Sequence, residues 1–187
     1  GKEHKWIPTV TDKADKKLEA GKDYTVEYST KNFKDVGTIE VTITGKGNYS
    51  GTVTRPYKIT PAPLTVTTEG ATRAYNGEPL TNETGSVEGL VNKETATVKP
   101  NGSQTVVGST DNTYTIEWGT AQSKNYKVKS EDLGKLTVTA QSIDPGTEEK
   151  PNPDYKGVKV NSPSNPVYDG KEHKWIPTVT DKADKKL

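Results

Sequence analysis

Few side chains in this sequence are of the types that catalysis or metal binding requires. The chain of 187 residues contains two histidines, His4 and His173, and no cysteine. A Ser-His-Asp triad needs a histidine beside its nucleophile, and a zinc site needs several His, Cys or carboxylate ligands close together. Acidic residues are plentiful enough for the carboxylate pair of a glycoside hydrolase, but they stand in polar stretches typical of solvated surface. We therefore predict that the chain is not an enzyme, uses no cofactor, and has no catalytic or metal-ligating residues.

Two short segments, "STDNTY" and "TDKADKK", carry side-chain oxygens of the kind that bind calcium. Neither segment has the spacing of an EF-hand loop. A calcium site therefore stays an open alternative, which a thermal melt with and without a chelator would settle.

Three aromatic residues are candidate ligand contacts, namely Trp118, Tyr75 and Tyr168. Tyr75 precedes Asn-Gly and Tyr168 precedes Asp-Gly, which are turn sequences, so each ring stands beside a turn where it could stack on a sugar. The competing interpretation, which the pattern favours, is that these rings pack back on their own modules. Trp118 ends the alternating stretch "YTIEW", and Trp6 adjoins Ile7 and a proline, so both are predicted core anchors.

The elements that position these residues are predicted to be β-strands, because apolar residues alternate with polar ones. The clearest examples are "DYTVEYS" and "GTIEVTITG", which place apolar residues on one face of each strand. Only "TDKADKKLEAG" has helical composition, and "EGLVNKETA" would add at most one turn. We predict an all-β fold of two small tandem modules in an elongated arrangement. The modules are β-sandwich-like or, alternatively, β-grasp-like with one short helix, and the first strands of a third module follow.

A long internal repeat organises the chain. Residues 1–18 and 170–187 are identical, reading "GKEHKWIPTVTDKADKKL" at an offset of 169 positions. Identity at solvated lysines, which tolerate substitution, indicates recent copying of a whole unit, so the chain resembles a window from a tandem array. The predicted divisions are a module lacking its first strand, a second module, a Pro-rich linker and the start of the next repeat, at residues 1–61, 62–141, 142–156 and 157–187.

The segment before the second 18-residue copy reads "VKVNSPSNPVYD", from Val158 to Asp169. It aligns with "LTVTTEGATRAYN", the predicted opening strand of the second module from Leu64. The first copy of the 18 residues has no such strand before it. We therefore predict that residues 158–187 complete a module in a neighbouring chain by head-to-tail strand exchange, or pack as an orphan hairpin. A frayed tail at an arbitrary boundary is the alternative.

The charge balance gives no sign of a polyanionic partner. Lys and Arg number 26 against 25 Asp and Glu, for a formal net charge of +1. A nucleic acid or an anionic membrane would need a basic face. The sequence also has no apolar run long enough to insert into a membrane.

The motifs "RAYNGEPL", "YTIEWGTAQSKNY", "VYDGKEH" and "VGTIEVTITGKGNYSGTV" follow one another through both modules. In this order and spacing they resemble the MBG and YDG repeats of large bacterial surface proteins. The resemblance covers nearly the whole chain apart from the linker. It implies all-β repeats and no catalytic residues, since the motifs are turns and core positions.

The resemblance implies a secreted protein attached to the cell wall. The predicted function is a repeat segment of a surface adhesin, acting as an extended stalk or spacer with weak multivalent binding to a host glycoprotein, mucin or matrix ligand. One alternative is a dedicated module that binds mucin glycans or a host protein. Another is a non-catalytic accessory repeat of a surface-anchored carbohydrate enzyme. By the same resemblance, a Lys-Asn amide crosslink would need a buried Lys, Asn and carboxylate together.

Overall fold

A computed structural model describes residues 2–153, 155, 157–163, 165–181 and 186. Within these residues the regular elements are thirteen β-strands and one short 3-10 helix, which confirms the predicted all-β fold. The chain forms two compact units, each built from several segments. Unit 1 comprises Gly1–Thr67, Gly85–Lys99 and Thr115–Asp132, and unit 2 comprises Thr68–Thr84, Pro100–Tyr114 and Leu133–Leu187.

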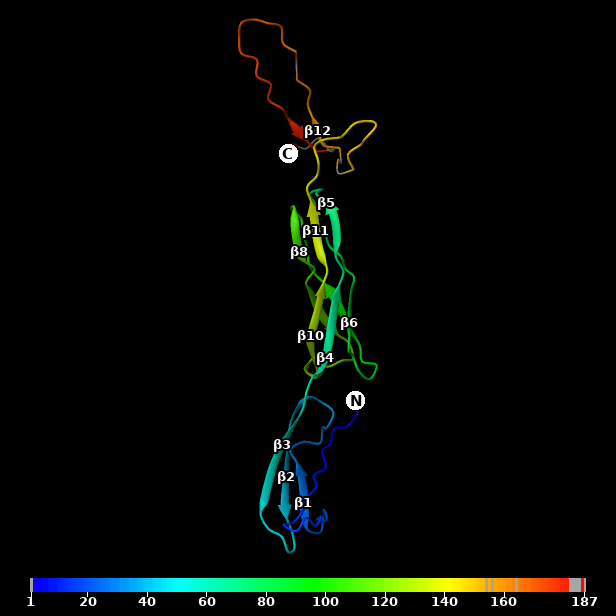
Figure 1. Ribbon diagram of the computed structural model, residues 1–187, viewed down its shortest axis with the longest axis vertical. Coiled ribbons are helices and arrows are strands. Elements are labelled where there is room, and N and C mark those ends of the chain that lie inside the picture. Colours follow the sequence, from blue (N-terminus) through cyan, green and yellow to red (C-terminus); the bar gives the residue numbers. More distant parts are fainter. Residues whose placement is uncertain (1, 154, 156, 164, 182–185, 187) are drawn as a thin grey trace. The chain divides into compact units, whose positions relative to one another are not determined.

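The first sheet of unit 1 is an antiparallel meander of three strands, seen side by side in Figure 1. Its strands are β1, β2 and β3, at Tyr24–Tyr28, Gly37–Gly45 and Thr52–Ile59. The predicted alternation is confirmed, since Ile39 and Val41 are buried while Thr38 and Glu40 are exposed. The N-terminal segment is tied to this sheet, because the Tyr28 hydroxyl donates to the Trp6 carbonyl at 2.8 Å.

The segment "TDKADKKLEAG", which has helical composition, forms no helix in the structure. Thr11 instead pairs with Lys17 in an isolated antiparallel bridge, and Asp15 has a φ of 59°, outside the right-handed helical region. The cause is local: the Asp12 carboxylate accepts hydrogen bonds from backbone N–H groups two and four residues on, which competes with helix formation. The turn of helix suggested at "EGLVNKETA" is also absent, and none of the described residues forms the α-helix that the β-grasp alternative requires.

A second sheet of unit 1 has the strand order β10-β4-β6, and β7 pairs with β9. The strands β4, β6, β7, β9 and β10 span Ala62–Thr68, Gly85–Glu88, Ala96–Pro100, Tyr114–Trp118 and Tyr126–Leu133, and the 3-10 helix η1 spans Ser123–Asn125. Leu64, Ala121 and Tyr126 form the buried core, with Val87 and Trp118 packed against it. The sheet and its flanking strands thus enclose one small apolar cluster.

Unit 2 is centred on β11, Lys135–Thr139, which is parallel to β5, Ala71–Ala74, and antiparallel to β8, Gly108–Asp111. Leu136, Val138 and Leu80 make its core. The backbones before β5 and β11 approach so closely that a β-carbon at Gly134 would collide with the Gly70 nitrogen. Glycine is therefore required where the two parallel strands begin.

The last described strands of unit 2, β12 and β13, form a short antiparallel pair. They span Lys159–Val160 and Val179–Thr180 and share two residue pairs. Val158 is buried beside this pair, whereas Tyr168 is 92% exposed. The segment thus pairs with itself in the single chain, and strand exchange between chains stays a prediction.

Candidate functional site

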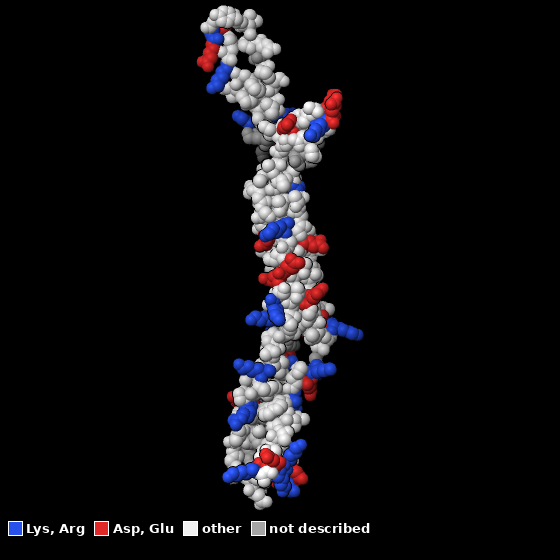
Figure 2. Space-filling view, viewed as in Figure 1, with Lys and Arg blue, Asp and Glu red and all other residues white. Residues whose placement is uncertain are grey.

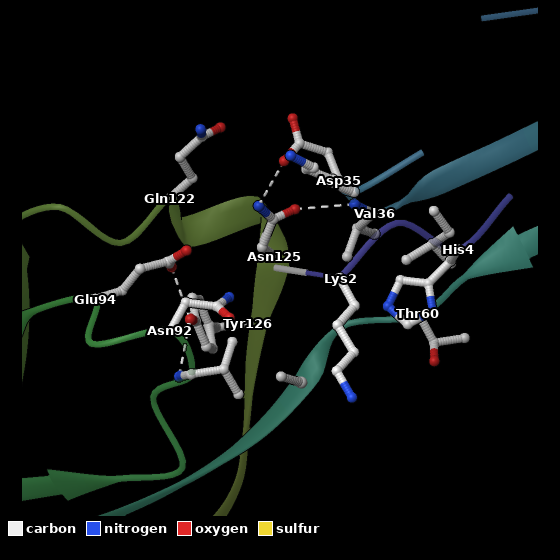
Figure 3. A pocket seen from close by; sticks show the side chains of 14 residues that line it. Lys2, His4, Asp35, Val36, Thr60, Asn92, Glu94, Gln122, Asn125 and Tyr126 are labelled. Atoms are coloured by element: carbon white, nitrogen blue, oxygen red, sulfur yellow. Dashed lines mark hydrogen bonds between the residues drawn. The ribbon is translucent and has the colours of Figure 1, made fainter. Parts of the chain in front are cut away.

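A network of polar side chains in unit 1 links the loop between β1 and β2 to the 3-10 helix η1 (Figure 3). The loop is shaped by Asn32, whose carboxamide oxygen accepts the N–H groups of Lys34 and Asp35 at 3.0 and 3.1 Å. Such Asx turns are a local property of asparagine. They present the Asp35 carboxylate towards η1, where Asn125 stands at the last position before β10.

The Asn125 carboxamide is held on both sides by this loop. Its oxygen accepts the Val36 N–H at 2.9 Å, and its nitrogen donates to Asp35 Oδ1 at 2.9 Å. Both bonds appear as dashed lines in Figure 3. One side chain therefore fixes a backbone group and a carboxylate that lie about 90 positions away in the sequence.

The Asp35 carboxylate collects two more donors. Lys124 Nζ and Asn32 Nδ2 donate to its Oδ2 at 2.9 and 2.8 Å. Together with Asn125 they hold the pKa of the Asp35 carboxyl well below its usual range, with the Lys124 hydrogen bond contributing most and desolvation opposing the shift. The carboxylate is thus stabilised in its charged form, which suits a structural contact and not a general acid.

Next to this network, the Tyr126 hydroxyl is bonded on both sides. It donates to Glu94 Oε2 at 2.7 Å and accepts the Val91 N–H at 3.2 Å. Burial and the Glu94 carboxylate raise the pKa of the Tyr126 hydroxyl, while the Val91 bond acts in the opposite direction. The tyrosine therefore ties the loop after β6 to the start of β10.

A cavity of about 350 Å³ lies beside these groups. Lys2 and His4 line it together with Asp35, Glu94 and Asn125. The carboxylates and the carboxamide are engaged in the hydrogen bonds described above, and no described hydroxyl near them is bonded to a histidine. The arrangement thus joins two segments of the chain, and we find in it no nucleophile and base placed for catalysis.

Sequence reasoning did not find this network. The only sequence signal was the Asn-Tyr pair, which precedes the last strands in both modules, at Asn48 and at Asn125. The partners Asp35 and Val36 carry no motif of their own.

The three aromatic candidates lie in different surroundings. Trp118 belongs to unit 1, where it is half-buried and stacks on Tyr126 with ring centroids 6.0 Å apart. Tyr75 and Tyr168 belong to unit 2, where Tyr75 is 36% exposed and Tyr168 is 92% exposed. Trp6, predicted as a core anchor, is 41% exposed and lies in a T-shaped contact with Tyr57, so that prediction is wrong.

Tyr75 lines a cavity of about 650 Å³ in unit 2, and Tyr168 does not. The other walls include Asn76 and Glu78 of the Tyr-Asn-Gly turn and the apolar side chains of Val107 and Ile143. An aromatic ring with polar groups at a turn is chemically suited to stacking on a sugar.

The segment "STDNTY" serves a structural purpose in unit 2. Its Asn112 is fully buried, with the amide donating to the carbonyls of Glu69 and Asn82 at 2.9 and 2.8 Å. The carboxamide oxygen accepts the Gly102 N–H at 3.2 Å. This oxygen, counted in the sequence as a candidate calcium ligand, is thus occupied by the backbone.

Among the described residues, no three His, Cys, Asp or Glu side chains are grouped so that they could hold a metal ion. In the same part of the chain no helix is long and apolar enough to cross a membrane.

Comparison with known proteins identifies one segment. The family model described as MBG domain (YGX type) matches residues 64–142, which confirms the resemblance inferred from the repeat motifs. MBG repeats are a non-catalytic domain type typical of extracellular surface proteins. No curated protein and no solved structure matches the chain.

Proposed function

We propose that this chain is a repeat segment of a bacterial surface adhesin and acts there as a spacer, attached through the parent protein to the cell wall. The MBG match at residues 64–142 and the exact repetition of residues 1–18 at 170–187 support this proposal. Weak contacts to a host glycoprotein, mucin or matrix ligand would be summed by repetition. On the face drawn in Figure 2 basic and acidic side chains are intermixed, in keeping with the net charge of +1.

The observation that carries the proposal is the network around Asn125. A spacer must resist bending where one sheet follows another. Only Thr60 and Pro61 connect β3 to β4, and Pro63 follows as the second residue of β4. The Asn125 side chain adds a second, non-covalent tie between the two sheets of unit 1. With two ties instead of one, bending at the connection has to break hydrogen bonds.

The distance between two spin labels tests this tie. Because the chain contains no cysteine, introduced cysteines at Glu27 in β1 and Lys129 in β10, both exposed, can be labelled uniquely. We expect a narrow distance distribution in the otherwise unchanged chain. Replacing Asn125 with Ala should broaden it, because the Val36 N–H and the Asp35 carboxylate lose their common partner.

A matched control is Lys22→Ala, which removes an exposed ion pair with Glu19 at 3.4 Å in the same unit. This variant should leave the distance distribution unchanged. If the unchanged chain already gives a distribution as broad as that of Asn125→Ala, the junction is flexible and the spacer proposal loses its support.

The cavity at Tyr75 favours a second candidate, a module that binds mucin-type glycans. Here Tyr75→Ala should abolish binding to immobilised mucin glycans, whereas Tyr75→Phe, which keeps the ring, should retain it. If the unchanged chain shows no glycan binding at all, this candidate is rejected while the spacer proposal stands. The third hypothesis, an accessory repeat of a carbohydrate enzyme, makes the same structural predictions as the spacer and differs only in the domains joined to it.

A further inference from the structure

The outer edge of β3 is open in the described part of the chain. β3 is the last strand in the order β1-β2-β3, so only β2 pairs with it. Glu40 of β2 turns its backbone towards β1, where its carbonyl accepts the Ser29 N–H at 3.0 Å. The backbone groups of its register partner Pro56 therefore point away from β2, and so do those of Lys58 two residues on. An edge of this kind can accept a further strand.

A groove of about 490 Å³ lies at the end of β3. One wall is the segment His4–Trp6 and the other is the end of β3 with Tyr57 and Thr60. Trp6 is 41% exposed here, and Ile7 next to it is 77% exposed. The groove thus places the partly exposed ring of Trp6 next to the end of β3.

The corresponding edge in unit 2 shows what such a groove accepts. β11 is paired in parallel with β5, from Leu136 opposite Ala71 to Thr139 opposite Ala74. The Tyr75 N–H then donates to the Thr139 carbonyl at 2.8 Å. Tyr75 opens the Tyr-Asn-Gly turn, so the accepted strand is the one that leads into this motif.

The same order of motifs identifies the strand that fits β3. β3 follows Asn48-Tyr49, just as β10 and β11 follow Asn125-Tyr126, so the end of β3 corresponds to the end of β11. The segment leading into Tyr168-Asp169-Gly170 corresponds to β5 and the Tyr75 turn. With Tyr168 in the place of Tyr75, its N–H meets the Thr60 carbonyl, and the outward position of Lys58 matches that of Thr137 beside β5.

The segment before the second 18-residue copy is available for such pairing. Val167 and Tyr168 are 87% and 92% exposed, and residues 165–169 lie outside β12 and β13. They can therefore pair elsewhere while β12 stays in place, with Val158 buried beside it and the Asn161 N–H bonded to the Thr178 carbonyl. Adding residues 165–169 at the end of β3 would cover apolar surface on both partners.

We propose that residues 165–169 of one chain add to the outer edge of β3 in a second copy of the chain, as a short parallel strand. Tyr168 N–H donates to the Thr60 carbonyl, and the Pro166 carbonyl accepts the Thr60 N–H. Pro166 has no N–H, so the carbonyl of Lys58 gains no partner from it. Each chain offers one donor segment and one acceptor edge, so the contact is heterologous and builds open head-to-tail oligomers.

The test uses the full chain and two variants with opposite defects. Tyr168→Pro removes the N–H that donates to the Thr60 carbonyl, in a residue that is exposed in its own chain. Thr60→Pro removes the N–H that donates to the Pro166 carbonyl, at an exposed position after β3. Circular dichroism spectra check that both variants stay folded. Sedimentation velocity then follows the mass of each protein against concentration.

We expect the mass of the unchanged chain to rise beyond a dimer with concentration, and each variant alone to stay at the 20.3 kDa of one chain. An equimolar mixture should stop at twice that mass, because Tyr168→Pro keeps its acceptor edge and Thr60→Pro keeps its donor segment. In the mixture, hydrogen exchange should slow at residues 57–60 of the Tyr168→Pro chain and at residues 165–169 of the Thr60→Pro chain.

Three outcomes overturn the proposal: an unchanged chain that stays monomeric at the highest soluble concentration, a mixture that stays monomeric, or a variant that assembles by itself as the unchanged chain does. Thr60 lines the same cavity as Asn125, but the Asn125 side chain bonds to Val36 and Asp35 and not to β3. The spin-label distance within one chain therefore tests the spacer proposal separately from these outcomes.

Discussion

Asn112→Ala should destabilise unit 2 more than any exposed substitution near it. The side chain is fully buried and makes three hydrogen bonds to the backbone, to the carbonyls of Glu69 and Asn82 and from the N–H of Gly102. Alanine fills part of the space but offers none of these partners. Three backbone groups would then be left without their hydrogen bonds inside the unit.

The magnitude follows from the three groups. Each buried backbone group that loses its partner costs about 1 to 3 kcal/mol. Since some relaxation and water entry are expected, we predict a loss of about 3 to 5 kcal/mol in the free energy of unfolding, in the lower half of the sum. For a region of this size the melting temperature should fall by roughly 12 °C or more.

Urea and thermal unfolding followed by circular dichroism measure the loss, and hydrogen exchange at β8 and β11 locates it. The control is Asn101→Ala in the same unit, since Asn101 is exposed and its Oδ1 accepts only the Thr113 hydroxyl at 2.7 Å among the bonds described. That change should stay within about 0.5 kcal/mol. If Asn112→Ala costs less than about 1 kcal/mol, or no more than Asn101→Ala, the buried carboxamide does not support the fold as argued.

Three further predictions concern packing and pH. Leu136→Ala, at a fully buried position, should lower the free energy of unfolding by about 2 to 5 kcal/mol in urea titrations, whereas Val53→Ala, at a residue 46% exposed, should change it by less than about 0.5 kcal/mol. Burial, with the Glu94 hydrogen bond, raises the pKa of Tyr126 in the folded protein above the ordinary value of 10.0. The neutral hydroxyl therefore stabilises the fold below pH 10.0, and this stabilisation is lost as the pH rises through the pKa of the folded protein. Tyr126→Phe should remove this alkaline loss of stability in unfolding curves at high pH. The Lys124 hydrogen bond, with those of Asn125 and Asn32, lowers the pKa of Asp35 in the folded protein. The Asp35 carboxylate therefore stabilises the fold above the ordinary pKa of 3.8, and this stabilisation is lost as the pH falls through the pKa of the folded protein. Asp35→Asn should unfold with a weaker acid dependence than the unchanged chain.

Residue alternation was sufficient to predict the strands and their buried faces. Ile39 and Val41 lie 2% and 0% exposed where the period of two placed them. Composition failed at residues 11–21, because a helix-compatible set of residues does not reveal that the Asp12 carboxylate binds nearby N–H groups. Trp6 was misplaced for a different reason: its large apolar ring was assigned to a core, but it lies 41% exposed in a T-shaped contact with Tyr57.

The polar network around Asn125 could not be predicted from the sequence, because its partners lie about 90 residues away and depend on how two loops meet. No local period or turn motif encodes such a contact. Asn112 was a candidate oxygen ligand for calcium in "STDNTY". Its burial decides whether that oxygen binds a cation or the backbone, and burial cannot be read from a six-residue segment. The Tyr75 turn was predicted from Asn-Gly, whereas its cavity depends on distant residues such as Ile143.

The parallel pairing of β5 with β11 also determines how unit 2 responds to a pulling force. Tension applied along the chain enters β5 at its start and leaves β11 at its end, so it acts along the strands and across all four residue pairs at once. The inter-strand hydrogen bonds are then loaded together in shear and cannot open one after another like a zipper. Forced unfolding follows the height of its barrier, so this geometry favours slow rupture under load. A protein exposed to flow would gain mechanical resistance from the parallel pairing of β5 and β11, without any covalent crosslink.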